Sequence, residues 1–76
     1  MTVDLNSRYG LNPAHSEVVE ACQIIEPCAA LDMGCSNGRN ALYLNQLGFN
    51  VTAIDANPSA INMLQDIVEQ EGLTNL

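Results

Sequence analysis

A glycine turn that directly follows a short apolar run constrains the fold of this chain more than any other feature. The turn lies in the stretch LDMGCSNG, residues 31–38. The apolar run 28–33 lacks strict alternation, which predicts a strand covered on both faces in a parallel sheet. Glycine lets the main chain turn sharply and approach a ligand, and a helix that begins after such a turn presents free amide groups. The junction therefore predicts a strand, a ligand-holding turn and a helix in succession.

Helix and strand patterns alternate along the rest of the chain. Asn12-Pro13 and Asn57-Pro58 each place a capping asparagine before a proline, which is favoured at the first helical position. Gly48 and Gly72 stand where helices commonly end in a left-handed residue. The predicted elements are a helix over 13–25, a strand over 28–33, a helix over 39–47, a strand over 51–54 and a helix from 58 to Gly72.

This order of elements, joined by short loops, is typical of an α/β fold with a Rossmann-like doubly wound parallel sheet. Only the N-terminal portion of such a sheet fits in 76 residues, because two strands leave both sheet edges open. We expect residues 1–11 to be irregular and residues 73–76 to lead toward a third strand. Residues 1–76 alone are therefore an incomplete domain, expected either to self-associate through an exposed sheet edge or to be a piece of a longer polypeptide.

The charge balance argues against a nucleic-acid or membrane partner. Nine carboxylates stand against two basic side chains, Arg8 and Arg39, and the formal net charge is −7. Nucleic-acid affinity depends largely on clustered Lys and Arg. No leader pattern opens the chain, and no apolar stretch approaches the roughly 18 residues of a membrane span. The three cysteines form no C-x-x-C pair, which favours reduced thiols and a cytoplasmic protein.

The spacing of the glycines discriminates between possible ligands. The dinucleotide fingerprint G-x-G-x-x-G requires a third small residue where this chain has Arg39. A phosphate-binding P-loop requires a lysine, and both basic side chains here are arginines. A fragment of an NAD-dependent oxidoreductase is therefore a less favoured alternative. A metal site is not expected, because the single histidine, His15, has no companion ligands.

The turn resembles the first motif of the class I S-adenosylmethionine-dependent methyltransferases, an acidic residue followed by G-x-G-x-G. Asp32, Gly34 and Gly38 match this motif, and Ser36 replaces its middle glycine. In the same family an acid at the end of the next strand accepts hydrogen bonds from the ribose hydroxyls. Asp55 stands at that position, after the second predicted strand.

The resemblance extends to a subfamily. The stretches 9–21 and 31–57 are similar to the N-terminal part of the tellurite-resistance methyltransferases, whose glycine turn also continues into Gly-Arg-Asn. This likeness implies that residues 1–76 are the cofactor-binding half of a methyltransferase domain, with S-adenosyl-L-methionine as cofactor. The implied acceptor is a small molecule such as the oxyanions tellurite or selenite, with a small thiol or another metabolite as the alternative. The alternative is a truncated Rossmann-like module that has no activity of its own and self-associates.

The resemblance also implies a role for individual residues at the methionine end of the cofactor. Gly34 and Gly38 let the turn pass beneath the methionine portion, with Cys35 and Ser36 between them. The remaining expected contacts are Asp32 toward the ammonium group, Arg39 or its backbone near the carboxylate, and Tyr9 closing over this end from the N-terminal segment.

At the nucleoside end, the resemblance implies that Asp55 holds the ribose and that Ala56 lies against the adenine. Methyl transfer from a sulfonium chiefly requires that the acceptor be positioned and water excluded. No catalytic residue is therefore assigned to this segment. Groups that select the acceptor are expected to come, in this fold, from loops after later strands.

Overall fold

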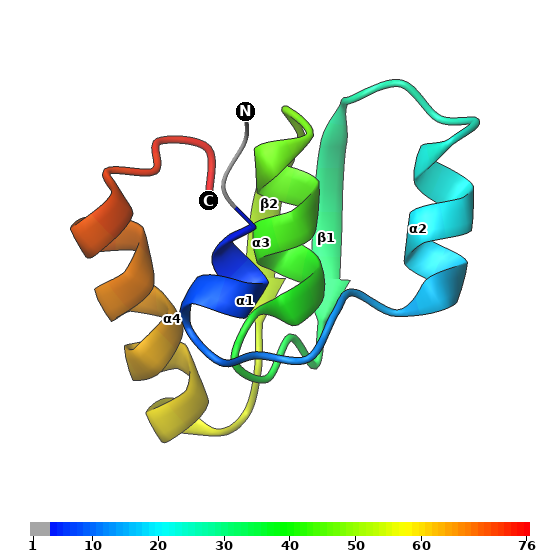
Figure 1. Cartoon of the computed structure of the whole chain (residues 1–76). Helices are drawn as coiled ribbons and strands as arrows, with labels where there is room; N and C mark the ends of the chain where they lie inside the picture. Colours follow the sequence, from blue (N-terminus) through cyan, green and yellow to red (C-terminus); the bar gives the residue numbers. More distant parts are fainter. Residues whose placement is uncertain (1–3) are drawn as a thin grey trace.

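A pair of parallel strands forms the centre of the structure, a computed structural model that describes residues 4–76 (Figure 1). The strands are β1 (Ala29–Met33) and β2 (Asn50–Ile54), paired in the register Ala30–Val51 and Asp32–Ala53. The helices are α1 (Leu5–Arg8), α2 (Ser16–Cys22), α3 (Arg39–Gln46) and α4 (Pro58–Glu71). The predicted α/β fold with a parallel sheet is confirmed, and both predicted strands are present.

Side chains alternate between the two faces of the sheet. Ala30 and its register partner Val51 lie on the face that packs against α3 and α4 in one apolar core. Leu31, Met33 and Ile54 point to the other face and are 58%, 75% and 49% exposed. The prediction that β1 is covered on both faces is therefore wrong for residues 4–76. Within that range, α3 connects the two parallel strands and α4 follows β2, and both helices pack on the same face.

The two helices of this face begin and end as the sequence predicts. α3 starts at Arg39, and the chain leaves it through Gly48 with φ +100°. α4 starts after Asn57, whose side chain accepts a hydrogen bond from the Ser59 amide at 3.0 Å, and it ends at Gly72 with φ +66°. Asn57 caps the start of α4 and a glycine follows the end of each helix, so these ends could be read from short motifs.

The N-terminal helix prediction, 13–25, is too long. α2 spans only Ser16–Cys22, and its N-cap is His15, whose Nδ1 accepts from the Glu17 amide at 3.2 Å. The Asn12 carbonyl is instead bonded to the Asn6 side chain. The backbone of Asn12 is therefore bonded to the N-terminal segment, and the helix begins at Ser16 rather than at residue 13.

The prediction that residues 1–11 are irregular is also wrong in part. Asp4 caps the short helix α1 by accepting a hydrogen bond from the Asn6 amide at 3.1 Å. Leu5, the first residue of α1, is 4% exposed and belongs to the core. One helical turn is too short to produce a periodic pattern. Residues 1–3 lie outside the described part of the chain.

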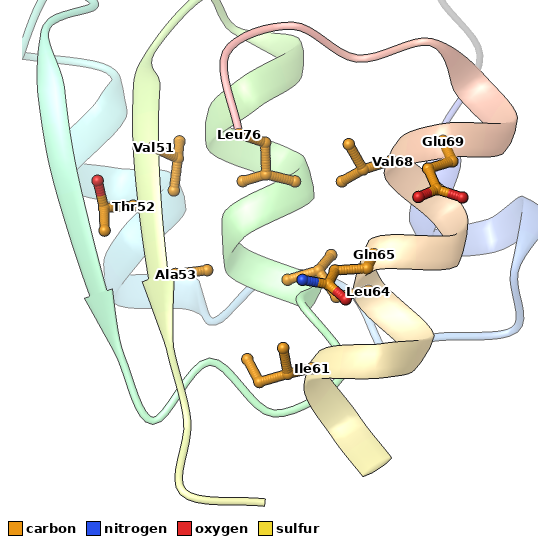
Figure 2. Close-up of a pocket in the computed structure, with 9 residues that line it drawn as sticks. All are labelled: Val51, Thr52, Ala53, Ile61, Leu64, Gln65, Val68, Glu69 and Leu76. Atoms are coloured by element: carbon orange, nitrogen blue, oxygen red, sulfur yellow. The ribbon is translucent and has the colours of Figure 1, made fainter. Parts of the chain in front are cut away.

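The last described residues run beside the free edge of β2. The Val51 amide donates to the Asn75 carbonyl at 2.8 Å, on the edge opposite to β1. Between this edge and α4 lies an open groove of about 520 Å³ (Figure 2). Its lining is Val51, Thr52, Ala53, Ile61, Leu64, Gln65, Val68, Glu69 and Leu76. The position of Asn75 agrees with the expectation that 73–76 lead toward a third strand.

Candidate functional site

The glycine turn between β1 and α3 is held against the end of β2. The Cys35 amide donates to the Ile54 carbonyl, and the Gly38 amide donates to the Cys35 carbonyl, both at 2.9 Å. Gly34, Ser36 and Gly38 have φ values of +68°, +53° and +94°. Three left-handed residues in five reverse the chain tightly, which is why small residues occupy these positions.

Two features require glycine at position 38, namely its left-handed backbone conformation and the close approach of a neighbouring side chain. A Cβ atom placed on Gly38 would lie 2.5 Å from Cδ1 of Leu64, a core residue of α4 that is 4% exposed. α4 therefore packs directly onto the backbone where α3 begins. Because a Cβ atom would collide with Leu64, the last position of the motif requires glycine.

Asp55 connects the two halves of the candidate site. Its Oδ2 accepts a hydrogen bond from the Ser36 amide at 2.8 Å, and its Oδ1 accepts one from the Asn57 amide at 2.8 Å. Hydrogen bonds from Asn57 and Ser36 lower the pKa of the Asp55 carboxyl. Each carboxylate oxygen can accept a second hydrogen bond, so Asp55 retains capacity for hydroxyl groups of a ligand.

Asp32 lies on β1 just before the turn and carries a partly desolvated carboxylate. Burial is the main cause that raises its pKa, the Ala41 amide opposes this effect, and the Asp55 charge adds to it. Oδ2 of Asp32 is buried and has no hydrogen-bond partner in the described part of the chain. A negative group in this state is suited to a positive charge.

A polar pocket of about 400 Å³ lies along the turn. One wall is the turn and the first residues of α3, and the other wall is the segment that follows α1. The lining residues are Leu11, Asn12, Gly34, Cys35, Ser36, Asn37, Arg39 and Asn40. Main-chain amides of a turn at a helix start, together with an arginine, suit a carboxylate or another anionic group.

Most of the residues assigned from the sequence are brought together here. Gly34, Cys35, Ser36 and Arg39 line the pocket directly. Gly38, Asp32 and Asp55 lie next to the pocket without lining it. Gly38 is the last residue of the turn, Asp32 is the next-to-last residue of β1, and Asp55 is hydrogen-bonded to Ser36. Ala56 is exposed beside Asp55.

Cys35 has the environment of a structural thiol. Its side chain is 4% exposed, and its Sγ lies 3.5 Å from the Ser36 carbonyl oxygen. Burial, and then the charges of Asp32 and Asp55, raise its pKa. Because the thiolate is the reactive form, this thiol is a poor nucleophile at neutral pH.

Tyr9 does not line the pocket. Its hydroxyl donates to Oε2 of Glu71 at 2.6 Å, near the end of α4. Arg8 contacts both oxygens of the same carboxylate, at 2.9 and 3.0 Å. The hydrogen bonds from Tyr9 and Arg8 lower the pKa of Glu71, and the bond to Glu71 raises the pKa of Tyr9. The N-terminal wall is formed instead by Leu11 and Asn12.

Sequence reasoning missed four residues that the structure places at this pocket, namely Leu11, Asn12, Asn37 and Asn40. Asn12 was interpreted as a helix cap. Asn40 accepts a hydrogen bond from the His15 amide at 2.8 Å through its Oδ1. No local pattern marks such long-range contacts.

In residues 4–76 no group of three or more potential metal ligands is found, and none of the described helices could cross a membrane.

Comparison with known proteins gives consistent matches. A family model described as "Tellurite resistance protein TehB" matches residues 4–76. The chain is 44% identical over 68 residues to the "Probable S-adenosyl-L-methionine-dependent methyltransferase TehB" of Haemophilus influenzae (strain 10810). A crystal structure of TehB from Haemophilus influenzae superposes with a TM-score of 0.87 at 43% identity, covering 92% of this chain. A shorter match, 45% identical over 49 residues and covering 63% of this chain, is the human "EEF1A lysine methyltransferase 2".

These relatives are much longer than the present chain. The chain spans 24% of the curated Haemophilus influenzae relative and 24% of the solved TehB chain. It spans 21% of the human lysine methyltransferase. The similarity therefore concerns one segment of each relative.

Proposed function

This chain belongs to the family of the tellurite resistance protein TehB, and on that premise we propose that residues 1–76 are the S-adenosyl-L-methionine-binding half of a methyltransferase domain. The observation that carries the proposal is the 2.8 Å hydrogen bond between the Ser36 amide and Asp55, beside a polar pocket lined by the same turn. Two motif positions far apart in sequence thereby meet at one site. The Haemophilus influenzae relative is named as S-adenosyl-L-methionine-dependent.

The pocket along the turn would hold the amino-acid end of the cofactor. Asp32, with its unpartnered buried oxygen, supplies negative charge toward the ammonium group. The start of α3 and the Arg39 side chain supply positive charge toward the carboxylate. Asp32 does not line the pocket itself, so in this proposal its charge acts on the ammonium group from the end of β1, while the carboxylate is oriented at the pocket.

Asp55 would hold the ribose. Its two oxygens already accept hydrogen bonds from Ser36 and Asn57, which fix the carboxylate plane. The remaining acceptor sites can each receive a hydroxyl hydrogen. Ala56, exposed after Asp55, leaves room for a flat base beside the strand end.

The cofactor supplies an electrophilic methyl group, so the residues of this segment bind and orient. The buried Cys35 thiol stays protonated because its pKa is raised, and it does not compete as a methyl acceptor. The acceptor in this proposal is a small molecule, an oxyanion such as tellurite or selenite. Arg39 is the single cationic side chain that lines the described pocket, so other parts of the site must supply further positive charge.

The three thiols support a reducing compartment, and we place the protein in the cytoplasm. Cys22, Cys28 and Cys35 are all free. Reduced cysteines are typical of cytoplasmic proteins.

The test is calorimetry of S-adenosylhomocysteine binding to the protein that carries this chain. Saturable one-site binding is expected. An NADH titration followed by nicotinamide fluorescence serves as the comparison. NADH binding without S-adenosylhomocysteine binding would overturn the proposal in favour of an oxidoreductase.

A second candidate function is that of a module that self-associates through its sheet edge. One observation in its favour is the outer edge of β2 beside the groove of Figure 2, where Val51 is bonded to Asn75 but residues 4–76 pair no third strand. Another is the exposure of Leu31, Met33 and Ile54 on the open face. Unpaired strand edges readily pair with another chain. Sedimentation of residues 1–76 is expected to show oligomers, and a stable monomer would contradict this candidate.

A further inference from the structure

The side chain of Asn6 joins the two walls of the pocket along the glycine turn. Its Nδ2 group donates to the Asn12 carbonyl at 3.2 Å and to the Arg39 carbonyl at 2.8 Å. Asn12 belongs to the N-terminal wall, and Arg39 is the first residue of α3 in the opposite wall. One side-chain amide therefore connects two backbone segments that are distant in sequence.

The backbone of Asn6 also makes a hydrogen bond to the N-terminal wall. Its carbonyl accepts a hydrogen bond from the Leu11 amide at 2.8 Å. Leu11 and Asn12 are the residues that this wall contributes to the pocket. The chain from 6 to 12 is thus closed into a loop whose far end lies at the cofactor site.

Packing alone does not explain an asparagine at this position. Asn6 is 4% exposed, and its Oδ1 is buried without a hydrogen-bond partner among residues 4–76. A buried unpaired acceptor costs free energy. A leucine of similar size would avoid that cost, so the amide is explained by its two donated hydrogen bonds.

We infer that Asn6 is a positioning residue for the cofactor pocket, an inference that rests on the proposed function. It sets the spacing between the Leu11–Asn12 wall and the start of α3. The wall is anchored again beyond the pocket, where the His15 amide donates to Asn40. Loss of the Asn6 bonds frees the part of the wall between these anchors.

Two substitutions test this role. Asn6→Leu removes both donors and keeps the approximate volume. Asn6→Asp keeps the shape, but an ionised carboxylate is an acceptor only and faces two carbonyl oxygens. Leu5→Ala is the matched control, since it removes buried surface from the same helix and none of the side-chain hydrogen bonds to either wall. S-adenosylhomocysteine affinity is measured by calorimetry well below the unfolding midpoint of each variant, so that unfolding does not lower it.

Both Asn6 variants are expected to lose affinity by roughly tenfold or more, while Leu5→Ala stays within about threefold of the unsubstituted protein despite a lower unfolding temperature. The loss in Asn6→Asp is expected to shrink from about pH 8 to about pH 5. Burial between two carbonyl oxygens should raise the pKa of the new carboxyl well above its ordinary value of about 3.9, and a protonated carboxyl donates one hydrogen bond. Asn6→Leu has no such recovery. Because affinity is measured on the folded variants at each pH, this difference reports the hydrogen bonds to the two walls rather than the stability of the fold.

Two other results would overturn the inference. Affinities of both Asn6 variants within about threefold of the unsubstituted protein would overturn it while leaving the proposed function intact. Equal losses in the Asn6 variants and in Leu5→Ala would also overturn it, since stability alone would then set affinity. If the unsubstituted protein fails to bind S-adenosylhomocysteine, the proposed function itself fails, which is a distinguishable outcome.

Discussion

The Ser36 amide lies 2.8 Å from Oδ2 of Asp55, so a hydrogen bond joins the middle of the glycine turn after β1 to the carboxylate that follows β2. Ser36 has a φ of +53°, and this left-handed conformation is uncommon for a residue with a Cβ atom. The serine that replaces the middle glycine of the motif is therefore held in place by the carboxylate of the second motif.

Asp55→Ala is expected to weaken S-adenosylhomocysteine binding by roughly tenfold or more, because the ribose would lose a charged hydrogen-bond acceptor. Asp55→Asn is expected to lose less, since its amide oxygen can still accept from Ser36. Calorimetry measures both. Asp66→Ala, an exposed carboxylate of α4, is the control and should bind normally. Normal binding by Asp55→Ala would remove the ribose assignment.

Acid should destabilise the protein partly through Asp55 and Glu71. Hydrogen bonds in the folded state lower the pKa of both carboxyls. Their stabilising contribution is present above the unfolded pKa values, about 4. It is lost as the pH falls below that value through the lowered folded pKa values. Unfolding by urea across this range should show a shallower acid loss for Asp55→Asn than for the unsubstituted protein. Equal slopes would contradict the role of the Asp55 hydrogen bonds.

The parts of the fold that follow from local chemistry could be predicted from the sequence. α4 is an example, because Asn57 caps its start and Gly72 ends it without help from other elements. The joint position of Gly38 and Asp55 followed from parallel-sheet topology, since the carboxyl ends of neighbouring strands meet at one edge.

The N-terminal segment could not be predicted, because long-range contacts determine it. The Asn6 side chain, which is bonded to the Asn12 carbonyl, is also bonded to the Arg39 carbonyl, 33 positions away. Tyr9 was expected at the cofactor, yet its hydroxyl is bonded to Glu71, 62 positions away. A sequence pattern contains no signal for partners at such separations.

Gly38→Ala is expected to destabilise the fold strongly, because both the backbone and its neighbour oppose a methyl group. The φ of Gly38 is +94°, and a Cβ would lie 2.5 Å from Leu64. We expect a loss of about 2–4 kcal/mol in the free energy of unfolding. Gly72→Ala is the control, since Gly72 has φ +66° but nothing within 4 Å of a Cβ, and it should lose only about 1 kcal/mol. Equal losses in urea unfolding would show that contact with Leu64 is unimportant.

Asp32→Asn should stabilise the protein at neutral pH while weakening cofactor binding. Burial raises the pKa of Asp32, so its charged form is disfavoured in the folded state and lowers stability above that pKa. The gain from asparagine should disappear as the pH falls through the raised pKa toward about 3.9, where aspartic acid is neutral in both states. Thermal unfolding at several pH values measures the gain, and calorimetry measures the loss of affinity. A variant that is less stable at neutral pH would contradict the argument.

Tyr9→Phe separates an anchoring role for Tyr9 from a role at the cofactor. The phenol donates to Glu71 at 2.6 Å, in a cluster that also contains Arg8. Removing one hydrogen bond to a charged acceptor should lower the unfolding temperature by roughly 5 °C. Affinity for S-adenosylhomocysteine should stay within about twofold, because Leu11 and Asn12, rather than Tyr9, line the pocket.

Glu71→Gln is the matched variant and should lower stability in the same way, since it weakens the same cluster from the other side. If Tyr9→Phe loses affinity but Glu71→Gln does not, then Tyr9 reaches the cofactor in the bound state and the anchoring account is wrong.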